Sequence, residues 1–114
     1  MRGTRTILIA AVLLLVLTVG ASAAMTSCYI DRELSFTGTS ANCYATIIDS
    51  GKSIEATMEL WCGNFPLALW SDTGTTRVDL DGSVNVASGM TYTLYVYGTT
   101  NGVPFSAQPL IMPN

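Results

Sequence analysis

Apolar and polar residues alternate most clearly between positions 53 and 62. The apolar face of this segment consists of Ile54, Ala56, Met58, Leu60 and Cys62. The preceding segment, residues 41–48, has an apolar face that consists of Ala41, Cys43, Ala45 and Ile47. A period of two residues is typical of a strand that buries one face. The pattern therefore predicts one strand in each segment.

The tetrapeptide Asp49-Ser50-Gly51-Lys52 lies between these two predicted strands. A two-residue turn at its centre is a common hairpin connection, because glycine accepts a positive φ. Such a turn pairs Asp49 with Lys52, and it pairs Ile47 with Ile54 further along the strands. Apolar residues then face apolar residues, whereas a shift by one residue would expose one apolar face. The sequence therefore predicts a β-hairpin over residues 41–62.

Turn residues recur about every ten positions in the rest of the chain, as in a sandwich or barrel. Five further strands are predicted, at residues 29–37, 67–71, 76–86, 91–97 and 103–112. The last of these is expected to be an edge strand, because Pro104 and Pro109 cannot donate to a neighbour. No longer stretch has a helical period. We therefore predict an all-β fold, a single antiparallel β-sandwich of about seven strands.

The N-terminal region has a different pattern. Arg2 and Arg5 precede a run of 13 mostly apolar residues at positions 7–19, and small residues follow up to position 24. This order is typical of a secretory signal peptide, and cleavage after Ala23 or Ala24 fits equally well. As a helix the run would rise only about 20 Å, less than the roughly 30 Å of a bilayer core. We therefore expect cleavage of a helical signal peptide rather than a membrane anchor.

We accordingly divide the chain into a signal peptide, residues 1–24, and a secreted β domain, residues 25–114. The second part contains three basic and eight acidic residues, which gives a formal charge of −5. An acidic surface of this kind disfavours nucleic acid as a partner. It also lacks the polybasic cluster that binds anionic membranes. We expect neither nucleic acid nor, after signal cleavage, a membrane among its partners.

One segment resembles a known structural corner. The sequence Val86-Ala87-Ser88-Gly89-Met90-Thr91-Tyr92-Thr93-Leu94-Tyr95-Val96 is similar to the E–F corner of fibronectin type III and related immunoglobulin-like domains. The resemblance implies that Tyr92 is a tyrosine-corner residue whose hydroxyl bonds to the main chain near residues 86–88. The strand-B tryptophan of fibronectin type III modules is missing. The chain also resembles small secreted proteins of Gram-positive bacteria with one such domain, which implies a fold and a compartment but no activity.

Three cysteines lie in the part that is expected to be exported, where disulfides can form. An odd number allows at most one bridge within the chain. The predicted hairpin places Cys43 and Cys62 about 13 Å apart, whereas a disulfide needs Cα atoms within about 7 Å. Two alternatives stay open, namely three free thiols or one bridge of unassigned pairing. Met25-Thr26-Ser27-Cys28 also weakly matches a lipobox, so a lipid anchor on Cys28 is a minor alternative.

The residues for catalysis or metal binding do not come together in this sequence. The chain has no histidine, so a Ser-His or Cys-His pair cannot form. Glu55 and Glu59 share a strand face but lie about 13 Å apart, farther than the paired carboxylates of glycosidases. We interpret them as part of a solvated face. An EF-hand-like string at residues 79–82 lacks acidic ligands at both ends of the loop. We expect no catalytic residue, no metal site and no cofactor.

Aromatic side chains are the remaining candidates for function. Trp61, Tyr95, Tyr97 and Tyr44 are predicted to point away from the core. Exposed aromatics stack on sugars or anchor proteins, although strands favour aromatics for packing alone. Our hypothesis is a non-enzymatic secreted or surface-associated module that binds an unknown protein; the alternative is a small carbohydrate-binding module on this face, with a cell-wall or other polysaccharide as ligand. A planar exposed row of rings would favour sugar, and a mixed apolar patch would favour protein.

Overall fold

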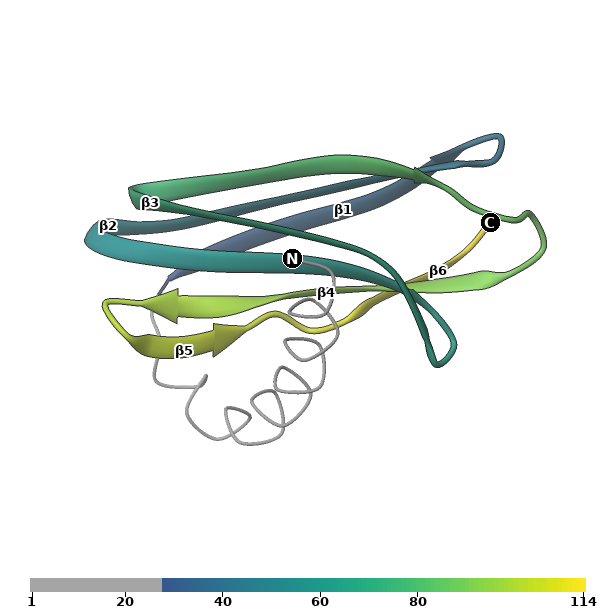
Figure 1. The fold of residues 1–114 in the computed structure, drawn as a ribbon. Helices are drawn as coiled ribbons and strands as arrows, with labels where there is room; N and C mark the ends of the chain where they lie inside the picture. Colours follow the sequence, from purple (N-terminus) through teal and green to yellow (C-terminus); the bar gives the residue numbers. More distant parts are fainter. Residues whose placement is uncertain (1–27) are drawn as a thin grey trace.

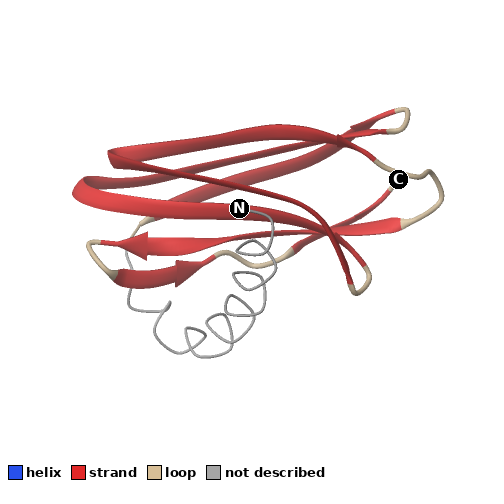
Figure 2. Ribbon diagram, viewed as in Figure 1, coloured by secondary structure: helices blue, strands red, loops and turns tan. Residues whose placement is uncertain are grey.

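The computed structural model describes residues 28–114, so the predicted signal peptide and its cleavage sites lie outside the described residues. The described part is all-β, as predicted, and contains no helix (Figure 2). Its strands are β1 (Tyr29–Thr37), β2 (Ser40–Cys62), β3 (Phe65–Asn85), β4 (Thr91–Thr100), β5 (Val103–Ser106) and β6 (Leu110–Pro113). Residues 28–114 contain no helix that is long and apolar enough to cross a membrane.

Two of the strands, β2 and β3, are unusually long and bend in the middle. The first arm of β2, residues 40–49, pairs with β1 and with the second arm of β3, residues 76–85. The second arm of β2, residues 53–62, pairs with the first arm of β3, residues 65–75, and with β4. Every pairing is antiparallel. Figure 1 shows both strands turning back at the left of the view, so that their two arms lie one above the other.

The predicted hairpin over residues 41–62 is therefore wrong. Ile47 pairs with Val78 instead of Ile54, and Asp49 pairs with Thr76 in the sheet. The expected contact of Asp49 with Lys52 is present as an ion pair, with 3.8 Å between Oδ2 and Nζ. The chain does reverse direction between residues 49 and 53, where the register shifts. However, β3 follows both arms of β2 and takes up their hydrogen bonds, so the arms do not pair with each other. The alternation of apolar residues is the same in both arrangements, and it could not distinguish them.

The strand count differs from the prediction for the same reason. The predicted breaks at residues 49–52 and 72–74 lie inside β2 and β3. At each of these places, two predicted strands form one continuous strand in the structure. At the C-terminus the opposite happens, because the predicted strand 103–112 is divided into β5 and β6. Both pair with β4, at different places along it. The described residues thus form six strands where about seven were predicted.

The predicted apolar faces of β2 do form the core. Ile54, Ala56, Met58, Leu60 and their counterparts in the first arm are buried almost completely. Leu34 from β1 and Leu94 and Val96 from β4 complete the same cluster.

A contact between the two arms of β3 shows how closely they face each other. An added Cβ atom on Gly82 would lie only 2.2 Å from the indole ring of Trp70. Gly82 therefore leaves the space that the ring of Trp70 occupies.

Candidate functional site

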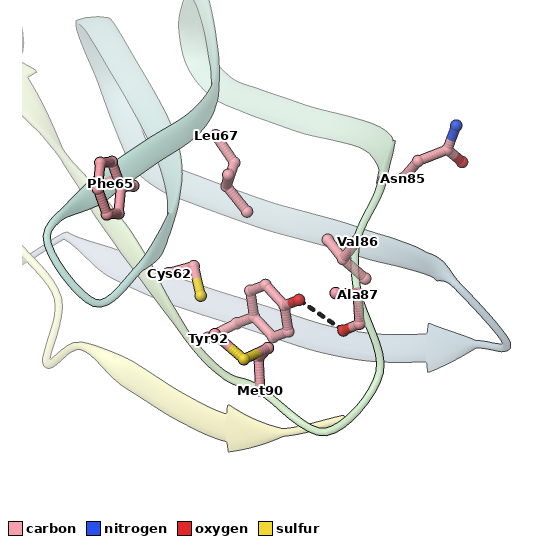
Figure 3. A pocket seen from close by; sticks show the side chains of 8 residues that line it. All are labelled: Cys62, Phe65, Leu67, Asn85, Val86, Ala87, Met90 and Tyr92. Carbon is pink, nitrogen blue, oxygen red and sulfur yellow. Dashed lines mark hydrogen bonds between the residues drawn. The ribbon is translucent and has the colours of Figure 1, made fainter.

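An open pocket of about 550 Å³ lies where β2 passes into β3 and where β3 passes into β4. It is lined by Cys62, Phe65, Leu67, Asn85, Val86, Ala87, Met90 and Tyr92. These side chains come from two chain reversals, residues 62–67 and 85–92, and Figure 3 shows that the amide of Asn85 points away from the others. The lining is therefore almost entirely apolar.

One wall of the pocket is the corner between β3 and β4. The buried Tyr92 donates its hydroxyl hydrogen to the carbonyl oxygen of Ala87, with an O–O distance of 2.6 Å (Figure 3). This bond confirms the contact that the tyrosine-corner resemblance implied. Gly89, with a φ of 83°, makes the turn that brings the two residues together. The corner is thus held by a specific side-chain bond.

Asn114 forms further hydrogen bonds with the same corner. The backbone nitrogen of Gly89 donates to the carbonyl of Asn114 at 3.1 Å, and the nitrogen of Asn114 donates to the carbonyl of Met90 at 2.9 Å. The side-chain amide of Asn114 also reaches the carbonyl oxygens of Gly38 and Ala87, each at 3.3 Å. These bonds fix the wall that carries Met90 before any ligand arrives.

The opposite wall is the start of β3. Gly63, with a φ of 58°, closes the turn from β2, and Leu67 falls in a register shift that leaves it without a partner residue in β2. The side chains of Phe65, Leu67 and Met90 remain 74%, 38% and 47% exposed. Large apolar residues are seldom gathered at a solvent-exposed rim without a function. The pocket can take up an apolar group.

Sequence reasoning missed this pocket. A signal was present, because Phe65 and Met90 directly follow the turn residues around Gly63 and Gly89, where a solvated loop would carry polar side chains. The hydrophobic periodicity does not indicate whether such positions are buried, because they lie at or next to the ends of strands.

The structure brings three of the four predicted face residues together around a carboxylate. The indole nitrogen of Trp61 donates to Oε1 of Glu59 at 2.7 Å, and the hydroxyl of Tyr97 donates to Oε2 of Glu59. The rings of Trp61 and Tyr95 meet edge to face, with 6.1 Å between their centroids and 81° between their planes. We call Glu59, Trp61, Tyr95 and Tyr97 the Glu59 cluster.

Tyr44, the fourth predicted residue, lies apart from the Glu59 cluster. It belongs to the first arm of β2, where its hydroxyl bonds to Thr46 and donates to Asp79 at 3.3 Å. Asp79 also accepts hydrogen bonds from Arg77 and Thr46, and the bond from Arg77 is the main reason that its pKa is lowered to about 2. Tyr44 thus belongs to a polar network on the other arm.

The prediction that Glu59 belongs to a solvated face is wrong. Glu59 is only 1% exposed, and Tyr97 is only 4% exposed. Burial raises the pKa of Glu59, although the bonds from Tyr97 and Trp61 oppose the shift. Burial and the adjacent carboxylate raise the pKa of Tyr97. The alternation pattern places Glu59 on the outer side correctly, but it cannot show that two aromatic donors hold its carboxylate.

The three cysteines are free thiols in the structure. Cys43 pairs with Leu34 and Gly82, whereas Cys62 pairs with Phe65 and Tyr92. Burial raises the pKa of Cys43 to about 11, which keeps this thiol protonated at neutral pH. The described residues contain no group of three or more histidine, cysteine, aspartate or glutamate side chains that could hold a metal ion.

Comparison with known proteins shows similarity of fold. No family model and no curated protein matches the chain. The structure of OgpA from Akkermansia muciniphila matches 77% of this chain with a TM-score of 0.55 and 8% identity; the matched part is 28% of OgpA. The sensor domain of the anti-sigma factor RsgI4 of Pseudobacteroides cellulosolvens matches 76% of this chain, with 88% of that domain covered, a TM-score of 0.50 and 18% identity. The chain thus shares its all-β architecture with a segment of one protein and with most of a sensor domain.

Proposed function

We propose that this protein is a non-enzymatic, secreted or surface-associated bacterial module that acts by binding another protein at the apolar pocket. We further propose that its fold is an immunoglobulin-like or fibronectin type III-like β-sandwich. The bent arms of β2 and β3 and the Tyr92 corner support this assignment. The sensor domain with a similar fold is compatible with a binding role. The observation that carries the function is the open pocket with its exposed apolar rim.

The geometry favours a protein partner over a carbohydrate. Sugar rings stack on flat, accessible aromatic faces, but Trp61 and Tyr95 stand at 81° to each other and do not form a planar row. Both carboxylate oxygens of Glu59 already accept internal hydrogen bonds, so they are engaged within the cluster. The pocket, in contrast, offers a mixed apolar patch of the kind that takes up a partner side chain.

The lining supports binding without chemistry. Its only strong nucleophile is the thiol of Cys62, and no acid or base lines the pocket beside it. A thiol needs such a neighbour to become a reactive thiolate. The chain has no histidine to supply one.

Binding energy at this pocket would come from burial of apolar surface. Burying one Leu, Phe or Met side chain of a partner contributes about 1.5–3 kcal/mol. The bonds of Tyr92 and Asn114 hold the wall in place beforehand, so little ordering cost opposes this gain.

The test uses peptides selected from a random library on the purified exported protein. Amide chemical shifts recorded during titration should change at Cys62, Val86 and Tyr92. Met90→Asp places a charge at the rim and should weaken peptide binding about tenfold or more, since an unpaired charge is costly to bury. The control Tyr29→Ser changes an exposed aromatic that does not line the pocket and should bind normally. Neutral oligosaccharides that shift Trp61 and Tyr95 instead would establish the carbohydrate alternative.

A further inference from the structure

The charged residues of this protein are unevenly distributed. Within residues 28–114 they lie in three blocks, at residues 31–33, 49–59 and 72–81, and none occurs at residues 34–48, 60–71 or 82–114. Two of these uncharged stretches, residues 60–71 and 82–114, supply all eight residues of the pocket lining. The described part carries three basic and eight acidic residues, so two copies repel each other over most of their surfaces. None of the residues that line the pocket is charged, so the lining itself adds nothing to that repulsion.

The pocket has a projecting apolar group at its own rim. Phe65 is 74% exposed, more than any other large apolar side chain among the described residues. A ring that projects from the rim of a cavity is an apolar group of the kind that such a cavity takes up. A cavity and a projecting ring on one patch are complementary to the same patch on a second copy, which is the requirement for a twofold symmetric interface.

Pairing of edge strands is a less suitable route to self-association. The edge strand β1 carries the charged residues Asp31, Arg32 and Glu33 at its centre. The first arm of β3 contains Pro66 and the register shift at Leu67, and β5 and β6 are only four residues long. Charges, proline, irregular register and short length all protect edges from pairing with other chains.

We propose that the partner at the pocket is a second copy of this chain. The proposal rests on the proposed function and names its partner. Two copies associate about a twofold axis, and the Phe65 ring of each enters the pocket of the other, against Leu67 and Met90. The contact surface is apolar and uncharged, and the acidic parts of the two copies remain in solvent.

Sedimentation equilibrium of the exported protein over a range of concentrations tests this arrangement. The wild-type protein should show a monomer–dimer equilibrium. Phe65→Ser should raise the dimer dissociation constant about thirtyfold or more, the effect of losing an interface hot spot. The matched control Tyr29→Ser, which removes another exposed aromatic ring, should leave the constant unchanged. Added salt should strengthen the dimer, because it screens repulsion between acidic copies.

Alkylation locates the interface independently. Cys62 lines the pocket, whereas Cys28 is also half-buried but does not line it. Maleimide labelling, read by peptide mass spectrometry, should slow at Cys62 with increasing protein concentration and stay constant at Cys28. A wild-type monomer at every concentration that still binds library peptides at the pocket would overturn the dimer and leave the proposed function standing. A monomer that binds no peptide there would overturn both, and a dimer unaffected by Phe65→Ser would overturn this interface.

Discussion

Glu59 illustrates how a single residue departs from its sequence pattern. It occupies an outward position of β2, yet its carboxylate is buried and accepts bonds from Trp61 and Tyr97. The alternation of residues gives its side of the sheet, but burial depends on Tyr97, which lies 38 positions away in the chain. Tyr92, in contrast, could be assigned in advance, because its partner Ala87 lies only five residues away within a recognisable corner.

The raised pKa of Glu59 predicts a specific pH dependence of stability. The pKa of Glu59 is higher in the folded protein than in the unfolded chain. The contribution of this carboxyl to the free energy of unfolding is therefore complete below the unfolded pKa of about 4.5. That contribution is lost as the pH rises through the folded pKa. The free energy of unfolding should therefore increase when the pH falls from 7 to 5. In Glu59→Gln, which keeps a carbonyl acceptor and an amide donor, this increase should be absent.

Urea unfolding at pH 5 and pH 7 measures the effect. Glu55→Gln is the matched control, because Glu55 lies four residues earlier on the same strand and is exposed. It should retain the wild-type response to pH. Asp79 does not affect the comparison. Its pKa is lowered to about 2, so its contribution to the stability of the protein is lost only in solutions more acidic than pH 5. Equal pH responses in the wild-type protein and Glu59→Gln would contradict the assignment.

At the scale of strands, position could be predicted and pairing could not. All seven predicted segments lie in or overlap strands of the structure, because a two-residue period is a local property. The pairing partner of Ile47 depends on whether β3 continues past residue 75. The sequence around Ile47 does not indicate whether it does. The pocket was missed for a related reason, because Phe65 and Met90 come to line one pocket only when the chain reversals at residues 62–67 and 85–92 lie together in the fold.

Gly82→Ala tests the contact that joins the two arms of β3. The added methyl group would lie 2.2 Å from the ring of Trp70, so the indole must move out of its packed position. We expect a loss of about 1–3 kcal/mol in the free energy of unfolding, as is usual when a core is overpacked. The exposed neighbour Ser83 offers the control Ser83→Ala, with a change within about 0.5 kcal/mol.

A double-mutant comparison identifies the cause of that loss. In a Trp70→Leu background the ring is absent, so Gly82→Ala should cost clearly less than it does in the wild-type protein. An unchanged cost would mean that the methyl group disturbs something other than Trp70.

At the scale of the whole molecule, the last prediction concerns export. Residues 1–24 combine two arginines, an apolar run of 13 residues and small residues before the β domain, and signal peptidase recognises that order. When the chain of residues 1–114 is expressed in a secreting bacterial host, intact-mass analysis of the culture supernatant should find a protein that begins at Ala24 or Met25. The same sample, alkylated after denaturation without reduction, should gain three labels, because Cys28, Cys43 and Cys62 are free thiols. A membrane-bound chain that retains Met1 would refute cleavage, whereas a chain that begins at a lipid-modified Cys28 would show a lipoprotein instead. Fewer than three labels would show that oxidation follows export, and Cys43 should then be spared, since its buried thiol has a pKa of about 11.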